Sequence, residues 1–197
     1  ILFIDEIHRL RPAIEEVLYS AMEDFALDLI LGKGPSARSM RLSLPPFTLV
    51  GATTKMSMLS SPLRDRFGHI LKLNFYSLDE IQKILLRSAK ILGCALLPEA
   101  AEKIARSSRQ TPRIANRLLR RTRDFSEVKN ISVIDLPVVS EVLNSLGIDR
   151  LGLDKRDREI LNVIIEKFQG GPVGLNTLSA SLSEEEETLE AIYEPYL

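Results

Sequence analysis

The residues near the start of the chain that are best suited to chemistry are two adjacent carboxylates, Asp5 and Glu6, which follow the apolar run Ile1–Ile4. Such a run predicts a central strand of a parallel sheet, and the carboxyl ends of these strands border the ligand-binding crevice. There Asp5 can hold Mg²⁺, directly or through water, and Glu6 can orient or deprotonate an attacking water. A strand followed by an acidic helix start would give the same pattern. His8 is interpreted as a packing or hydrogen-bonding residue.

Hydroxyl and guanidinium groups that suit the same chemistry follow later in the chain. Thr54 ends Gly-Ala-Thr-Thr, directly after a second apolar strand at 47–51, where its hydroxyl can bind a γ-phosphate or the nucleophilic water. By itself this tetrapeptide is a weak signal, and a turn or a helix cap explains it better. Arg66 lies in Ser-Pro-Leu-Arg-Asp-Arg-Phe-Gly and can reach a neighbouring subunit's γ-phosphate, where it would stabilise transition-state charge. The alternative for Arg66 is a surface ion pair with Asp65.

A third group of candidates lies on a predicted helix that starts at Thr111-Pro112. Arg113, on its first turn, can touch nucleotide phosphates from the far side of the cleft. The later arginines of this helix are interpreted as a solvated basic face: Arg117, Arg120, Arg121 and Arg123.

The elements that must position these residues change in type along the chain. Apolar spacing predicts a helix over 12–25, and alternation predicts a β-hairpin over 27–44, before the strand at 47–51 and one more at 70–75. Ser77 and Glu80 form a predicted capping box that opens the first of four helices, the last of which ends at Gly147. After a predicted linker at 148–153, three short helices are expected at 154–168, 175–182 and 184–196.

Composition narrows the class of protein. The 197 residues are 45% hydrophobic and 27% charged with a net charge of −1, which argues against binding nucleic acid through bulk charge but leaves local patches open. Cys94 is the sole cysteine, which excludes an internal disulfide framework, and its apolar neighbours predict a buried structural thiol. With no apolar run of ~20 residues and no signal-peptide pattern, we expect a cytoplasmic protein without a membrane partner. Because it begins inside a strand and ends at Leu197, we interpret it as a fragment.

Several strings resemble the RuvB family of AAA+ ATPases, the motors that move Holliday junctions along DNA. They span the whole chain in order: Ile-Asp-Glu-Ile-His-Arg-Leu (4–10), Glu-Asp-Phe (23–25), Leu-Pro-Pro-Phe-Thr-Leu-Val-Gly-Ala-Thr-Thr (44–54), Ser-Pro-Leu-Arg-Asp-Arg-Phe-Gly (61–68), Thr-Pro-Arg-Ile-Ala-Asn-Arg-Leu-Leu-Arg-Arg (111–121), Gly-Gly-Pro-Val-Gly-Leu (170–175) and Tyr-Glu-Pro-Tyr-Leu (193–197).

The resemblance implies an α/β fold: part of an AAA+ parallel-sheet nucleotide domain with an inserted β-hairpin (1–75), an all-α lid (76–149) and a winged-helix DNA-binding domain truncated before its wing (150–197). It also implies roles for the site residues. Asp5 and Glu6 would be the Walker B pair, Thr54 sensor 1, Arg66 the arginine finger offered to the adjacent subunit, and Arg113 sensor 2. The residues that line the nucleotide site would further include Glu23, Asp24, Phe25 and, at the lid entrance, Tyr76.

The cofactors and partners follow from the same resemblance. ATP and Mg²⁺ are the expected cofactors, and a homohexamer acting on duplex DNA at Holliday junctions is the expected assembly. The hairpin at 27–44 would dock onto RuvA through Leu29, Ile30 and Leu31, and RuvC would join in the resolving complex.

The chain departs from the family pattern at both ends. It contains no Gly-x-x-x-x-Gly-Lys-Ser/Thr, the phosphate-binding loop that in the family precedes the position of Ile1, so we expect negligible ATPase activity from the chain alone. The DNA-contacting arginines would follow Leu197, and the acidic run Glu184–Glu187 would repel a phosphate backbone. Two alternatives stay open: a clamp-loader-type ATPase, which shares the Ser-x-x-Arg-x-Arg pattern, and a non-enzymatic module that binds RuvA.

Overall fold

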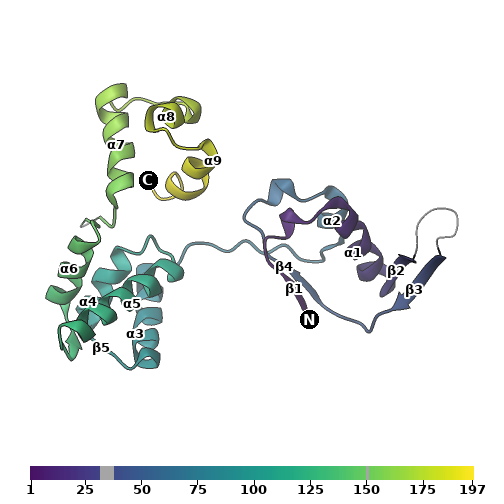
Figure 1. Cartoon of the computed structure of the whole chain (residues 1–197), viewed down its shortest axis with the longest axis horizontal. Coiled ribbons are helices and arrows are strands. Elements are labelled where there is room, and N and C mark those ends of the chain that lie inside the picture. The colour runs from purple at the N-terminus through teal and green to yellow at the C-terminus, as the bar shows by residue number, and fades with distance from the viewer. Residues whose placement is uncertain (32–37, 150) are drawn as a thin grey trace. The chain divides into compact units, whose positions relative to one another are not determined.

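The computed structural model describes residues 1–31, 38–149 and 151–197, without the side chains of residues 29–31, 38 and 39. The chain divides into two compact units, Ile1–Lys72 and Leu73–Leu197, and each is considered by itself (Figure 1). The predicted boundary at 149/150, between the lid and the winged-helix region, lies inside the second unit, and the residue boundaries of the three domains stay a prediction.

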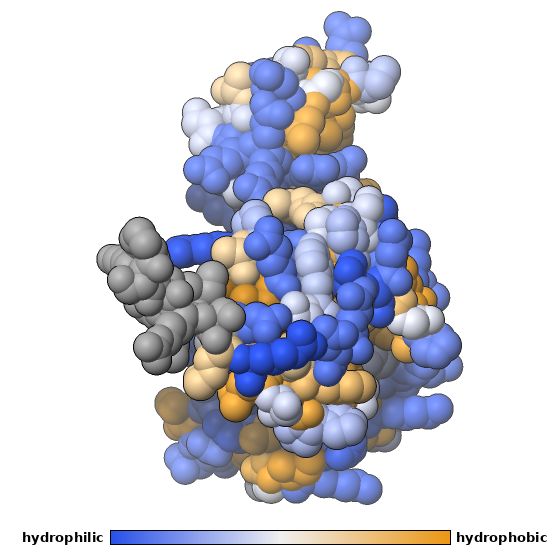
Figure 2. All heavy atoms as spheres, turned by 90° about the vertical axis from the view of Figure 1, so that its right-hand side faces the viewer, coloured by the Kyte–Doolittle hydropathy of each residue, from blue (hydrophilic) through white to orange (hydrophobic). Residues whose placement is uncertain are grey.

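The first unit contains a pair of parallel strands, β1 (Leu2–Ile4) and β4 (Leu49–Gly51). They run in the register Leu2↔Leu49 to Ile4↔Gly51, so their carboxyl ends lie at one edge, as the sequence predicts. The two apolar faces are less buried than expected for a central strand, since Phe3 is 59% exposed. Figure 2 shows exposed hydrophobic side chains lying among hydrophilic ones on one face of the molecule.

The strand predicted at 70–75 is wrong. These residues have no regular secondary structure, and Leu71 and Leu73 are 84% and 91% exposed. The reason is that an apolar run becomes a strand only by hydrogen-bonding to a neighbour. The strand pairs formed within the described part of the chain are β1·β4, the hairpin β2·β3 and β5·β6, and residues 70–75 join none of them.

Helix α1 (Pro12–Asp24) follows the short helix η1 (Ile7–Arg9) and ends where Phe25 adopts a left-handed conformation. It leads into the antiparallel hairpin of β2 (Ala26–Leu31) and β3 (Arg38–Ser43). This confirms the predicted change from helical spacing to the alternating pattern of strands. The predicted turn of this hairpin lies outside the described residues.

Beyond β4, the short helices η3 (Met56–Met58) and α2 (Ser61–Arg66) complete the first unit. Its core is small, with Ile7, Leu59 and Leu63 buried together.

The second unit begins with four helices that the sequence predicts well: α3 (Leu78–Leu92), α4 (Pro98–Arg106), α5 (Pro112–Val128) and α6 (Leu136–Ser145). The capping box of Ser77 and Glu80 is present at the start of α3. A short parallel pair, β5 (Ala95–Leu96) with β6 (Val133–Ile134), was not predicted. Cys94, predicted to be buried, is partly buried against the helical core, and burial raises the pKa of its thiol.

Three further helical segments follow: α7 (Lys155–Phe168), α8 (Leu175–Leu182) and α9 (Glu186–Thr188), the last continued by η4 (Leu189–Tyr193). Their core consists of Ile160, Leu178 and Leu189. The predicted linker is an ordered turn in its described residues, because the carboxylate of Asp149 accepts hydrogen bonds from two backbone N–H groups of the same loop. Among the described helices, none is long and apolar enough to cross a membrane.

Candidate functional site

The first part of the candidate site lies at the carboxyl edge of β1 and β4. Backbone hydrogen bonds tie the two strand ends together, from the Ile7 N–H to the Ala52 carbonyl and from the Ala52 N–H to the Ile4 carbonyl, both 2.9 Å long. The hydroxyl of Thr54 donates a hydrogen bond of 3.3 Å to the carboxylate of Glu6. Two residues 48 positions apart in the sequence therefore meet at one edge, which is the arrangement expected of a water-orienting carboxylate beside a phosphate-binding hydroxyl.

His8 connects this edge to a residue that the sequence reasoning missed. Its Nδ1 lies 2.9 Å from the hydroxyl oxygen of Thr53 and 3.3 Å from a carboxylate oxygen of Glu6, and its side chain is only 4% exposed. His8 is therefore a hydrogen-bonding residue, as interpreted from the sequence. The only sequence signal for Thr53 was its position beside Thr54.

The turn that carries the two carboxylates has an unusual backbone. Glu6 has φ 49° and ψ 45°, in the left-handed region that residues other than glycine rarely adopt. The backbone N–H of Glu6 donates to the Asp5 carboxylate at 3.0 Å, which supports the turn. Within the described residues no group of three or more side chains of metal-binding type is found. Asp5 stays the carboxylate that is predicted to hold Mg²⁺.

Arg66 lies at the end of α2 and contacts its own chain. Its guanidinium forms an ion pair of 2.7 Å with Glu23, lies 4.4 Å above the ring of Tyr19, and donates to the Pro62 carbonyl at 2.9 Å. The side chain is 27% exposed, so it is neither buried in the core nor fully extended into solvent. The acidic partner is thus Glu23 from α1, and not the adjacent Asp65 considered from the sequence.

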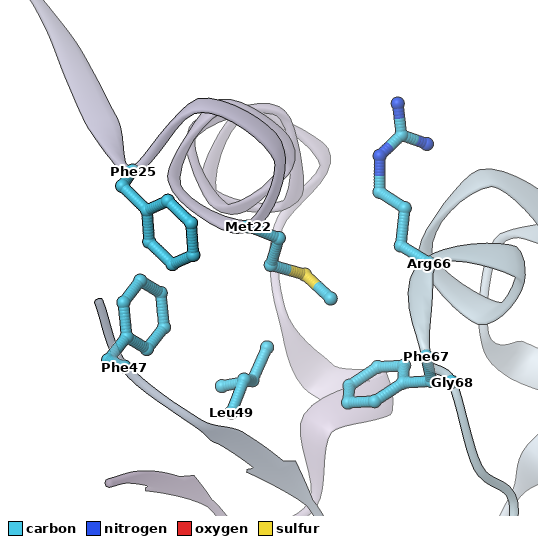
Figure 3. A pocket seen from close by; sticks show the side chains of 7 residues that line it. All are labelled: Met22, Phe25, Phe47, Leu49, Arg66, Phe67 and Gly68. Atoms are coloured by element: carbon cyan, nitrogen blue, oxygen red, sulfur yellow. The ribbon is translucent and has the colours of Figure 1, made fainter.

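The predicted nucleotide-lining segment 23–25 lies beside this arginine. Phe25 stands edge-on to Phe47, with ring centres 6.1 Å apart, at a cavity of about 190 Å³ that Arg66 also borders. Figure 3 shows the guanidinium of Arg66 directed away from the apolar side chains of this cavity. Asp24 pairs with Arg41 of the hairpin at 2.6 Å. The candidate residues of the first unit therefore form two groups, one at the sheet edge and one at the end of α1.

The two remaining candidates belong to the second unit. Tyr76 is 45% exposed, and its backbone N–H donates to the Gln110 carbonyl at 3.4 Å. Arg113 is exposed on the first turn of α5, just after Arg109 and Gln110, which are both left-handed with φ of 53° and 50°. Tyr76 and the turn that precedes Arg113 are therefore neighbours, and their roles toward a nucleotide stay a prediction.

Arg109 is a feature that the sequence reasoning did not identify. Its guanidinium pairs with the fully buried Asp157, lies 3.1 Å from Asp154, and stacks 4.6 Å above the ring of Tyr196. Burial raises the pKa of Asp157 in spite of the adjacent guanidinium. These contacts join the turn after α4 to α7 and to the C-terminal segment, over sequence separations of 45 and 48 residues for the two carboxylates.

Comparison with known proteins covers the chain from end to end. Residues 1–73 match the family model of the Holliday junction DNA helicase RuvB P-loop domain, residues 76–149 that of the RuvB AAA lid domain, and residues 150–197 that of the RuvB C-terminal winged helix domain. The fold is accordingly an AAA+ nucleotide domain, a helical lid and a winged-helix domain.

Solved structures agree with the family models. The Thermotoga maritima RuvB Holliday junction branch migration motor is 50% identical with a TM-score of 0.81, covering 100% of this chain and 61% of that one. A mutant of the same protein has a TM-score of 0.84 at 50% identity, with 100% and 62% covered. NtrX from Brucella abortus, at 10% identity and a TM-score of 0.54 over 99% of this chain and 49% of that one, shares the fold alone.

The chain thus spans about 61% of the length of the Thermotoga structures that it matches. The order of the three matched models, the half-identity to the Thermotoga protein and the meeting of Glu6 with Thr54 lead to one conclusion: this chain belongs to the RuvB family.

Proposed function

We propose that the protein containing this chain is an ATP-driven motor that moves Holliday junctions along DNA. The observation that carries the proposal is the hydrogen bond between Thr54 and Glu6 across the carboxyl edge of β1 and β4. It brings a carboxylate that can orient water next to a hydroxyl that can bind a γ-phosphate, which is the pairing that ATP hydrolysis requires. Membership of the RuvB family supports the choice of DNA junctions as the substrate.

The residues at the sheet edge receive different roles. Asp5 would hold Mg²⁺ together with the phosphates of ATP, and the ion would neutralise charge on those phosphates. Glu6 orients or deprotonates the attacking water, and Thr54 fixes the direction of that carboxylate or contacts the γ-phosphate. The hydrogen bond of His8 with Thr53 and its close approach to the Glu6 carboxylate hold both residues at this edge.

The second half of the site is assigned to a neighbouring subunit of a homohexameric ring. Arg66 is the finger that reaches the γ-phosphate bound by the adjacent protomer. Because Glu23 pairs with Arg66, and Phe25 borders the same cavity, we assign the segment 23–25 to that same half. Tyr76 and Arg113 contact the nucleotide from the lid.

The partners of the motor follow from the family. The hairpin that contains Leu29, Ile30 and Leu31 docks onto RuvA, the winged-helix region contacts duplex DNA, and RuvC joins in the resolving complex. The protein works in the cytoplasm, and the chain alone hydrolyses no ATP because it carries no phosphate-binding loop among its 197 residues.

The substitution Glu6→Gln in the full-length protein tests the assignment. It keeps the shape of the side chain and one acceptor oxygen but removes the base, so we expect ATP to stay bound while turnover falls by at least about 10²-fold. The measurements are nucleotide affinity and steady-state ATPase rate. Glu16→Gln, an exposed carboxylate of α1, is the matched control and should leave both unchanged. Normal turnover in Glu6→Gln would contradict the proposed function.

A further inference from the structure

Three side chains of α1 contact both ends of α2, the helix that carries Arg66. Glu15, Tyr19 and Glu23 are spaced four residues apart, so they lie along one face of α1. Glu15 and Tyr19 contact Ser60, the N-cap that precedes α2, and Tyr19 and Glu23 contact Arg66, which ends the helix. Tyr19 therefore contacts both ends of the short helix.

At the start of α2, the side chains of Ser60, Glu15 and Tyr19 form a closed hydrogen-bonded set. The hydroxyl of Ser60 accepts from the Leu63 N–H at 3.3 Å, which caps the helix, and donates to the Glu15 carboxylate at 2.6 Å. The hydroxyl of Tyr19 donates to the same carboxylate oxygen at 3.1 Å and lies 3.1 Å from the Ser60 hydroxyl. Glu15 is only 8% exposed, and a buried carboxylate is unfavourable unless such hydrogen bonds are made. The set therefore fixes where α2 begins.

At the end of α2, the same helix face sets the direction of the guanidinium. The guanidinium carbon of Arg66 lies 4.4 Å from the centre of the Tyr19 ring, and a guanidinium nitrogen lies 2.7 Å from the Glu23 carboxylate. An arginine carries many rotamers, so a finger that must meet a phosphate in a narrow geometry benefits from a surface that limits them. The buried Leu63 anchors the middle of α2 to the core, whereas Tyr19 and Glu23 contact the guanidinium itself.

We propose that Glu15 and Tyr19 are positioning residues for Arg66, which set the start of α2 and the direction of its terminal guanidinium. This inference rests on the proposed function, in which Arg66 acts on the site of a neighbouring subunit. It follows that a defect at Tyr19 must appear in the neighbour's active site and not in the subunit's own. A merely structural role for Tyr19 would not give this pattern.

The test is a complementation experiment with full-length rings, measuring ATPase rate in mixtures of two variants. Arg66→Ala removes the finger, with an expected loss of about 10³–10⁵-fold. Tyr19→Leu removes both the ring and the hydroxyl, with an expected loss of about 10²-fold from misplacement. Tyr19→Phe keeps the ring and should lose less, and it serves if the leucine variant does not fold. Glu16→Gln is the control on the exposed face of α1.

Mixtures decide between the outcomes. Arg66→Ala with Glu6→Gln should regain turnover, because one subunit offers a finger and the other a working carboxylate. Tyr19→Leu with Glu6→Gln should regain turnover as well, whereas Tyr19→Leu with Arg66→Ala should not. Recovery of turnover when Tyr19→Leu is mixed with Arg66→Ala would overturn the positioning role. So would a lack of recovery when Tyr19→Leu is mixed with Glu6→Gln, if Arg66→Ala with Glu6→Gln does recover. If turnover does not recover when Arg66→Ala is mixed with Glu6→Gln, the assignment of Arg66 to a neighbouring site is overturned instead.

Discussion

Arg66 and Arg109 have the same kinds of partner in very different surroundings. Each guanidinium pairs with a carboxylate and lies over a tyrosine ring, at 4.4 Å from Tyr19 and 4.6 Å from Tyr196. The carboxylate of Glu23 is 57% exposed, while that of Asp157 is completely buried. An exposed pair is worth at most about 1 kcal/mol, whereas breaking a buried one costs about 3–5 kcal/mol. The pair of Arg66 can therefore be broken at little cost, as its proposed role as a finger requires, whereas Arg109 is held in place.

The strongest test of this contrast is Arg109→Ala. Because Asp157 would be left buried and unpaired, we expect the free energy of unfolding of the second unit to fall by about 3–5 kcal/mol in urea titrations. Arg106→Ala is the matched control, since Arg106 has an exposed partner, Glu102, one helical turn away, and should lose less than about 1 kcal/mol. Equal losses in the two variants would mean that Arg109 is no more fixed than a surface residue.

A smaller effect is expected from Gly152→Ala, beside the Tyr196 ring that supports Arg109. Gly152 has a φ of +83°, and an added Cβ would lie 2.8 Å from the Tyr196 hydroxyl and 3.0 Å from the Ser107 Cα. We expect a loss of about 1–3 kcal/mol, measured in the same titrations. Gly170→Ala separates strain from crowding, because its φ is +72° but its Cβ would meet nothing within 4 Å. If both variants lose the same amount, the Tyr196 contact is not tight.

The smallest effect on stability is expected from Glu23→Gln. It removes the charge opposite Arg66 at an exposed position, so the free energy of unfolding of the first unit should change by less than about 1 kcal/mol. Differential scanning calorimetry at low and high salt is the measurement, with Glu102→Gln as an exposed reference pair. A loss comparable to that of Arg109→Ala would show that Arg66 is locked to its own subunit, and would remove the contrast between the two arginines.

The elements found from the sequence are those whose signals are local. Ser77 and Glu80, three residues apart, predicted the start of α3, and Pro112 predicted the first turn of α5. The strand predicted at 70–75 failed because its apolar run says nothing about whether a partner strand is present. In the site, Glu6 and Thr54 could be placed together, since parallel strands share an edge.

The contacts that hold the two arginines could not be read from the sequence. Tyr19 and Ser60 are 41 residues apart, and Arg109 and Asp157 are 48 apart. No local pattern selects these pairs from the many tyrosines, serines and charged residues that could meet. Only packing of α1 against α2, and of the turn after α4 against α7, determines which groups come together.

The left-handed turn at Glu6 has a consequence for how this motif can evolve. A glycine or asparagine would adopt φ 49° more readily, so a glutamate there gives up roughly 1–3 kcal/mol of stability. The bend lets the carboxylate reach Thr54 while the very next residue, Ile7, enters the core at 1% exposure. Inserting or deleting one residue between β1 and Ile7 would break both arrangements together. The length of this segment should therefore vary less in evolution than the identity of its side chains.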